Sequence, residues 1–186
     1  LPEQLESSKG LNMASGDTLL ILTPQMGVPP ATIYATLDTV VGTSTPAESI
    51  PVLDFDDGTQ EYIDFYCVMP SHYAGTTGVT LTIVFSAAEA ASDVVAWQAA
   101  FRRVADDAED LNTTAHTYAY NEVIATAPSV IGEVAYDNIP FTNGADMDSV
   151  VAGDYFVLRV TRDPTPSSGT DVTGDASLHA VHVKET

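Results

Sequence analysis

Short apolar runs, each ended by Gly, Pro, Asp or Asn, recur along the chain and strongly constrain its fold. Within several runs polar and apolar residues alternate, as in 79–85, where every second residue from Val79 is apolar. Side chains of a strand point alternately to its two faces, so this spacing predicts strands that each bury one face. The expected strands are residues 18–23, 33–41, 51–56, 62–69, 79–85, 94–104, 113–125, 134–141, 155–162 and 177–184.

Residues 94–104 are ambiguous, because the alanines in and around them are also typical of a helix. The alternation of Val95, Trp97 and Phe101 with other residues favours a strand. A short helical turn is expected only at 145–151. Strands at such regular spacing, without crossover helices, predict an all-β fold, an antiparallel jelly-roll-like β-sandwich.

Domain organisation is expected to be simple. Residues 1–16 are polar and predict an N-terminal arm, with Leu1, Leu5 and Leu11 as candidate partner-binding residues. Residues 17–186 predict a single β-sandwich domain. No apolar run approaches the length needed to span a membrane, so no membrane partner is expected.

Charge excludes one large class of partners. The chain has 6 Lys+Arg against 26 Asp+Glu, a net charge of −20, and no cation lies between Lys9 and Arg102. Such a surface repels phosphate, so nucleic acid and anionic lipid are not expected as partners. The hydrophobic content of 45% and mean hydropathy of +0.07 argue for a folded chain rather than a disordered acidic one.

Acidic residues at 54–61 are the weak candidates for a cation site. Asp54, Asp56, Asp57 and Glu61 supply oxygen atoms, but their spacing differs from that of a calcium-binding EF-hand loop. A solvated strand face followed by a turn explains them more simply. The sequence therefore predicts no metal.

Catalytic motifs are not apparent in the sequence. His179 and His182 are three residues apart, which on a regular strand places them on opposite faces. Cys67 falls on the apolar face of its strand and is expected to be an inert core thiol. Neither a nucleophile elbow, a phosphate-binding loop nor a dinucleotide fingerprint is present. We expect no cofactor and no enzymatic activity.

Aromatic residues leave a glycan-binding role open. Sandwich domains that bind carbohydrate usually do so with exposed aromatic side chains. Trp97 is expected in the core, whereas Tyr73, Tyr118 and Tyr120 are the candidates for exposure.

A set of short motifs resembles a known family. The motifs are YATLDT at 34–39, PVLDFD at 51–56, VMP at 68–70, YAG at 73–75, FTNGADMD at 141–148, AGD at 152–154, LRV at 158–160, RD at 162–163 and TGDA at 173–176. Together they resemble small β-rich proteins encoded among the structural genes of tailed phages. The likeness runs from about Gly16 to Thr186. Residues 40–49 depart from it as an insertion, and the region after Val94 is unusually rich in alanine.

The resemblance implies a function in the virion. It is similar to jelly-roll decoration or cement proteins, which implies a protein that binds the major capsid protein on the outer surface of the head and stabilises the shell. Decoration of a threefold site implies a homotrimer. The alternative that the sequence leaves open is a glycan- or receptor-binding β-sandwich module of a tail fibre or cell surface.

Overall fold

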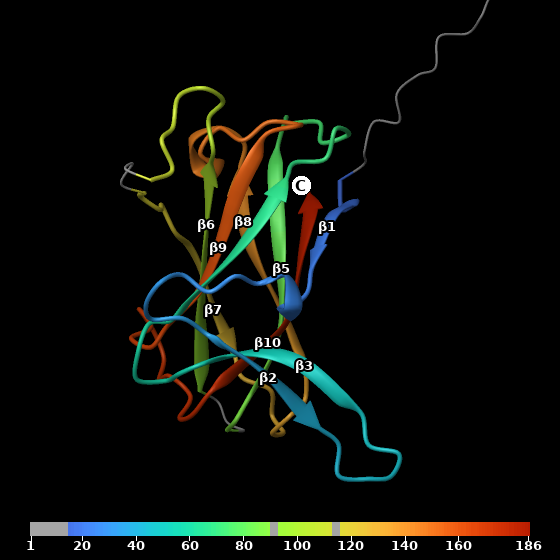
Figure 1. The fold of residues 1–186 in the computed structure, drawn as a ribbon. Helices are drawn as coiled ribbons and strands as arrows, with labels where there is room; N and C mark the ends of the chain where they lie inside the picture. Colours follow the sequence, from blue (N-terminus) through green and yellow to red (C-terminus); the bar gives the residue numbers. More distant parts are fainter. Residues whose placement is uncertain (1–14, 90–92, 113–115) are drawn as a thin grey trace, which may run out of the picture.

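The computed structural model describes residues 15–89, 93–112 and 116–186. This part of the chain forms ten strands and two short 3-10 helices (Figure 1). The strands are β1 (Thr18–Leu22), β2 (Thr36–Val41), β3 (Ser49–Phe55), β4 (Tyr62–Val68), β5 (Gly78–Ala87), β6 (Val94–Arg103), β7 (Asn121–Thr126), β8 (Ala135–Thr142), β9 (Tyr155–Asp163) and β10 (Ala176–Glu185). The 3-10 helices are η1 (Pro24–Met26) and η2 (Ala145–Met147).

The strands pair into two antiparallel sheets. The first sheet has the order β2-β3-β10-β5-β8, and β1 pairs with the part of β10 that β3 leaves unpaired. The second sheet has the order β4-β9-β6-β7. From β3 onward every connection crosses between the sheets except the β6–β7 hairpin. This arrangement of eight strands is a jelly roll, which confirms the expected all-β sandwich.

Aromatic side chains fill the space between the two sheets. Trp97 on β6 is fully buried, and its ring lies edge-on to Phe55 at 5.1 Å and to Phe85 at 5.7 Å between ring centroids. Phe55 and Phe85 come from the first sheet and Trp97 from the second, so these contacts join the two layers. Such edge-to-face contacts add to the stabilisation from burial of apolar area.

Residues 94–103 of the expected 94–104 form β6, so favouring a strand over a helix there was right.

Two expected strands begin later than the sequence predicts. The prediction of a strand over 113–125 is wrong at its start, because β7 begins at Asn121. Tyr118 and Tyr120, which raise the strand propensity of this segment, stack on each other instead of extending the strand. Residues 33–41 likewise form a strand only from Thr36.

A β-bulge in β10 corrects the prediction for its two histidines. The pairing of β10 with β5 shifts register between Leu178 and Ala180. The extra residue turns the side chains after it to the other face, so His179 and His182 both lie on the outer face of the first sheet. The prediction that they face opposite sides is therefore wrong.

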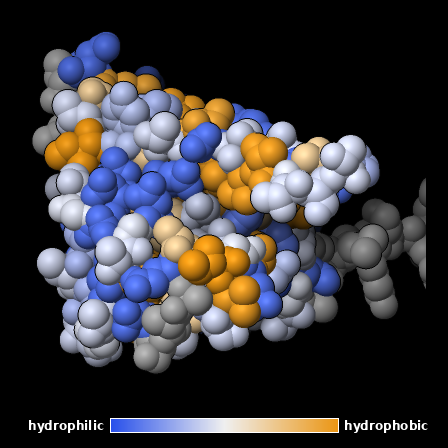
Figure 2. All heavy atoms as spheres, turned by 90° about the horizontal axis from the view of Figure 1, so that it is seen from below, coloured by the Kyte–Doolittle hydropathy of each residue, from blue (hydrophilic) through white to orange (hydrophobic). Residues whose placement is uncertain are grey.

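The hairpin of β2 and β3 extends beyond the body of the sandwich (Figure 1). All six residues of β2 are exposed, and Val40 lies opposite the exposed Ile50 on β3. In the view from below, orange hydrophobic residues gather at several places on this end of the molecule (Figure 2). Residues 42–48, most of the insertion noted above, form the tip of the hairpin.

The expected arm lies almost wholly outside the described residues, and Leu1, Leu5 and Leu11 fall there too. Of the arm, only Ser15 and Gly16 are described, and the Gly16 amide donates a hydrogen bond to the Glu185 carbonyl at 2.7 Å. Within 15–89, 93–112 and 116–186, no helix has the length and apolar character needed to cross a membrane.

A fully buried arginine attaches the loop between β9 and β10 to the core. The Arg162 guanidinium donates to the carbonyls of Phe55, Val172 and Gly174 at 2.7–3.0 Å and pairs with Asp171 at 2.7 Å. One charged group therefore satisfies three backbone acceptors that burial would otherwise leave without partners.

Replacement of Arg162 by alanine is expected to destabilise the fold by about 3–5 kcal/mol, because it leaves the Asp171 charge and three carbonyls without their donor. Urea unfolding followed by fluorescence measures the change. Arg103→Ala is the matched control, since the Arg103 side chain is 37% exposed, and it is expected to cost about 0–1 kcal/mol. An equal decrease in the free energy of unfolding in the two variants would contradict the role of Arg162 in attaching the loop to the core.

Candidate ligand-binding cleft

The outer face of the second sheet carries polar and aromatic side chains. The odd-numbered residues of β4 point into the core, so Tyr62, Asp64 and Tyr66 point outward. Tyr155 and Arg159 on the neighbouring strand β9 face the same way. In the antiparallel register Asp64 lies directly opposite Arg159, which brings a carboxylate and a guanidinium together at the centre of this face.

Arg159 is the central contact of this face. Its Nε and one terminal nitrogen donate to the two carboxylate oxygens of Asp64, each at 2.7 Å. The guanidinium carbon lies 4.0 Å from the ring centroid of Tyr118 and 5.4 Å from that of Tyr62. Burial disfavours the charged guanidinium, but the hydrogen bonds and charge of Asp64 outweigh it, and the pKa of Arg159 is raised. The group is therefore permanently charged and held in one position.

Two stacked pairs of tyrosines flank Arg159. Tyr66 and Tyr155 lie with ring centroids 6.4 Å apart and planes 24° apart, and they are 47% and 42% exposed. Tyr118 and Tyr120 stack similarly at 6.2 Å and 26° but are half-buried. Burial raises the pKa of Tyr120 to about 12, so its hydroxyl stays protonated near neutral pH. The first pair offers an accessible aromatic surface, and the second packs on the guanidinium.

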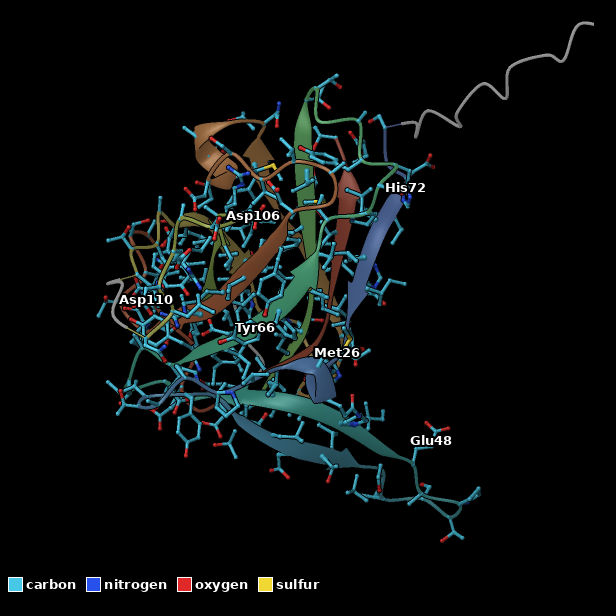
Figure 3. All side chains as sticks on the ribbon, turned by 45° about the horizontal axis from the view of Figure 1, so that its top comes forward. Met26, Glu48, Tyr66, His72, Asp106 and Asp110 are labelled. Atoms are coloured by element: carbon cyan, nitrogen blue, oxygen red, sulfur yellow. The ribbon has the colours of Figure 1, made fainter. Side chains whose placement is uncertain are left out.

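The loop after β6 forms one wall of the site. Arg102 at the end of β6 forms a salt bridge with Glu109, and the same Glu109 oxygen lies 3.2 Å from Nδ1 of His116. Figure 3 shows Tyr66 on β4, with Asp106 and Asp110 on this loop. The Arg102 contact holds the loop beside the sheet face.

A cavity of about 280 Å³ lies between these groups. Tyr66, Tyr118, Tyr155 and Arg159 line it, and Pro30 from the segment after η1 closes one side. A hollow of about 270 Å³ shares Arg102 and His116 with it, and a third of about 480 Å³ shares Val104 and Tyr155. The three hollows therefore adjoin and form an extended depression, which we call the tyrosine cleft.

Sequence reasoning found part of the tyrosine cleft. Tyr118 and Tyr120 were expected to be exposed and are half-buried. Tyr118 lines the cleft, and Tyr120 stacks on Tyr118. Tyr73 is only 4% exposed, and its hydroxyl contacts the sulfur of Met147 at 3.4 Å. The prediction that Tyr73 is exposed is therefore wrong. The tyrosines at 62, 66 and 155 and Arg159 were missed. The alternation that placed the odd residues of 62–69 in the core already implied that Tyr62 and Tyr66 face outward.

The acidic candidates for a cation site accept hydrogen bonds from the protein itself, across the β3–β10 pair at Asp54 and in turns and loops at the other three residues. Asp54 accepts from the Ser177 hydroxyl at 2.6 Å, and Asp56 accepts from the Gly58 amide at 2.5 Å. Asp57 accepts from the Gly174 amide at 2.6 Å, and Glu61 from the Asp56 amide at 2.9 Å. Among the described residues, no three His, Cys, Asp or Glu side chains come together in a way that suits a metal ion.

A serine–histidine pair lies on the other sheet. The Ser86 hydroxyl and Nε2 of His179 are 2.9 Å apart, and burial lowers the pKa of His179. This neutral histidine has the contact that a general base makes with a nucleophile. Ser86 is only 5% exposed, however, so an incoming carbonyl has little access to its hydroxyl.

Comparison with known proteins gives structural likeness alone. No protein-family model matches the chain, and no curated protein matches it in sequence. The xylan-binding CBM22-1 domain of Paenibacillus barcinonensis Xyn10C is 11% identical with a TM-score of 0.46, over 92% of this chain and 96% of that domain. A Bacteroides thetaiotaomicron protein described as sugar-binding is 10% identical with a TM-score of 0.43, over 93% and 96%. The Cry4Aa toxin of Bacillus thuringiensis is 9% identical with a TM-score of 0.47, over 89% of this chain and 23% of the toxin.

Cys67 lies in the core as expected, and burial raises the pKa of its thiol to about 11. At pH 8 only about one molecule in a thousand then carries the reactive thiolate. We expect the native protein to react with Ellman's reagent far more slowly than the urea-unfolded chain, measured by absorbance. Equal rates in the two states would contradict the burial of Cys67.

Proposed function

We propose that this protein is a glycan-binding β-sandwich module whose ligand site is the tyrosine cleft. The exposed stacked pair of Tyr66 and Tyr155 at the edge of a cavity is the observation that carries the proposal. The C–H faces of a sugar ring are apolar and pack on aromatic rings, whereas its hydroxyls need fixed polar partners. Aromatic side chains with a polar end suit a surface that is partly wet and partly covered.

The surroundings of the tyrosine pair support the same function. Arg159 lines the cavity, and Asp64 fixes its orientation through two hydrogen bonds. A few convergent polar groups beside aromatic walls are typical of small-molecule sites. A preformed site also loses little conformational entropy when a ligand binds, which favours affinity.

Substitution of Tyr66 or Tyr155 by alanine is expected to weaken glycan binding about tenfold or more, because each removes half of the stacking surface. A glycan array identifies a ligand, and isothermal titration calorimetry then measures its Kd. Tyr136→Ala is the matched control, since Tyr136 is 66% exposed on β8 of the other sheet. Binding that survives both cleft substitutions, or an array without any bound glycan, would refute the proposal.

A second candidate is the capsid decoration protein that the sequence resemblance implies. The specific observation in its favour is the projecting hairpin, whose exposed Val40 and Ile50 lie side by side on β2 and β3. Exposed apolar surface of this kind is typical of contact sites on other proteins. The major capsid protein, the homotrimer and the outer surface of the virion remain predictions.

Replacement of both Val40 and Ile50 by serine is expected to abolish co-sedimentation with phage heads that lack this protein, since it removes the apolar contact. The matched control replaces Val130 and Ile131, which are also exposed and adjacent but lie on the loop between β7 and β8. Sedimentation velocity of the free protein tests the trimer. Failure of the unchanged protein to co-sediment would exclude this function.

A further inference from the structure

Positive charge is concentrated at the tyrosine cleft in a chain that has little of it. Only 6 Lys and Arg occur in the whole sequence, and Arg102, Arg103 and Arg159 line two of the three adjoining hollows. In a protein with a net charge of −20, this concentration first suggests a site for an anionic ligand.

Each of these arginines is already paired with a carboxylate. Arg159 binds Asp64 through two hydrogen bonds of 2.7 Å. Nε of Arg103 lies 2.6 Å from a carboxylate oxygen of Asp154. Arg102 forms its salt bridge with Glu109. Three cations are matched by three anions, so these pairs together contribute 3 − 3 = 0 to the charge of the cleft.

The ion pairs Arg159–Asp64 and Arg102–Glu109 are mostly buried. Side-chain exposure is 19% and 5% for Arg159 and Asp64, and 10% and 11% for Arg102 and Glu109. Separation of such a pair leaves an uncompensated charge away from water, which is strongly unfavourable. Replacement of the partner carboxylate of either arginine by an anionic ligand therefore has a large unfavourable free energy.

One end of the depression is acidic. The hollow of about 480 Å³ is lined by Asp106 and Asp107 in addition to the paired Asp154. These carboxylates and the net charge of −20 repel an approaching anion. The ligand groups that match stacked tyrosines and compensated charges are apolar ring faces and uncharged hydroxyls.

We propose that the tyrosine cleft binds a neutral oligosaccharide of several sugar units and discriminates against acidic glycans such as uronates. The inference rests on the proposed glycan-binding function and adds the ligand class. Adjacent hollows accommodate successive units of a chain. Arg159 orients the rings of Tyr62 and Tyr118, and the paired arginines hydrogen-bond to hydroxyls without supplying net charge.

Calorimetric titration with matched hexasaccharides tests the ligand class. The probes are neutral xylohexaose, cellohexaose and mannohexaose, anionic hexagalacturonate and cationic hexaglucosamine. At least one neutral probe is expected to bind, with a Kd that changes less than about twofold between about 20 and 500 mM NaCl, because no net charge is neutralised. The anionic probe is expected to bind at least about tenfold more weakly.

The outcomes separate this inference from the function on which it rests. Binding of no hexasaccharide, together with an empty glycan array, overturns the proposed function. Tighter binding of the anionic or the cationic probe, weakened steeply by salt, overturns the neutral-ligand inference and leaves glycan binding intact.

Removal of one compensating carboxylate provides a second test. Asp64→Asn keeps the shape of the side chain but leaves the charge of Arg159 unmatched, so binding of hexagalacturonate is expected to increase at least about tenfold relative to the neutral probe. Glu109→Gln makes the same change at Arg102 and serves if Asp64→Asn does not fold. Glu133→Gln, on an exposed loop, is the charge-matched control. If a folded cleft variant shows no gain in hexagalacturonate binding relative to binding of the neutral probe, the proposed role of charge pairing is overturned.

Discussion

Burial of one face of each sheet against the other is the constraint on which the rest of this structure depends. Trp97 contacts Phe55 and Phe85 across the two layers, and apolar residues at every second position extend this contact along the strands. Because the inward-facing positions of the strands are filled by the core, side chains that can contact a ligand or a partner lie at outward-facing positions, in loops and at sheet edges. The tyrosine cleft consists of such outward-facing and loop residues, and the projecting hairpin lies at the β2 edge of the first sheet.

Within the tyrosine cleft, one cross-strand ion pair organises the aromatic groups. Asp64 and Arg159 occupy opposing positions on β4 and β9, and the guanidinium fixed by this pair supports Tyr62 and Tyr118. The same pair contributes no net charge to the cleft. The fixed orientation of the guanidinium and the compensation of its charge are thus two results of a single contact, and both bear on the glycan binding that we propose for the cleft.

Prediction from the sequence succeeded where a local pattern has one structural meaning. Alternation placed Trp97 and Cys67 in the core and separated Arg159 from Arg162, which lie on opposite faces of β9. It failed at His179 and His182, because a single bulge reverses the side-chain direction and leaves no clear local signal. It also extended β7 too far, since Tyr118 favours a strand but packs on Arg159.

By itself the sequence determined the all-β class, the approximate strands, the apolar faces and the strongly acidic surface, because these follow from residue spacing and composition. Only the tertiary structure decided which outward-facing groups meet. Tyr66 and Tyr155 are 89 positions apart, and Asp64 is 95 positions from Arg159. Sheet order and register bring them together, and both depend on long-range packing of the whole chain rather than on any local motif.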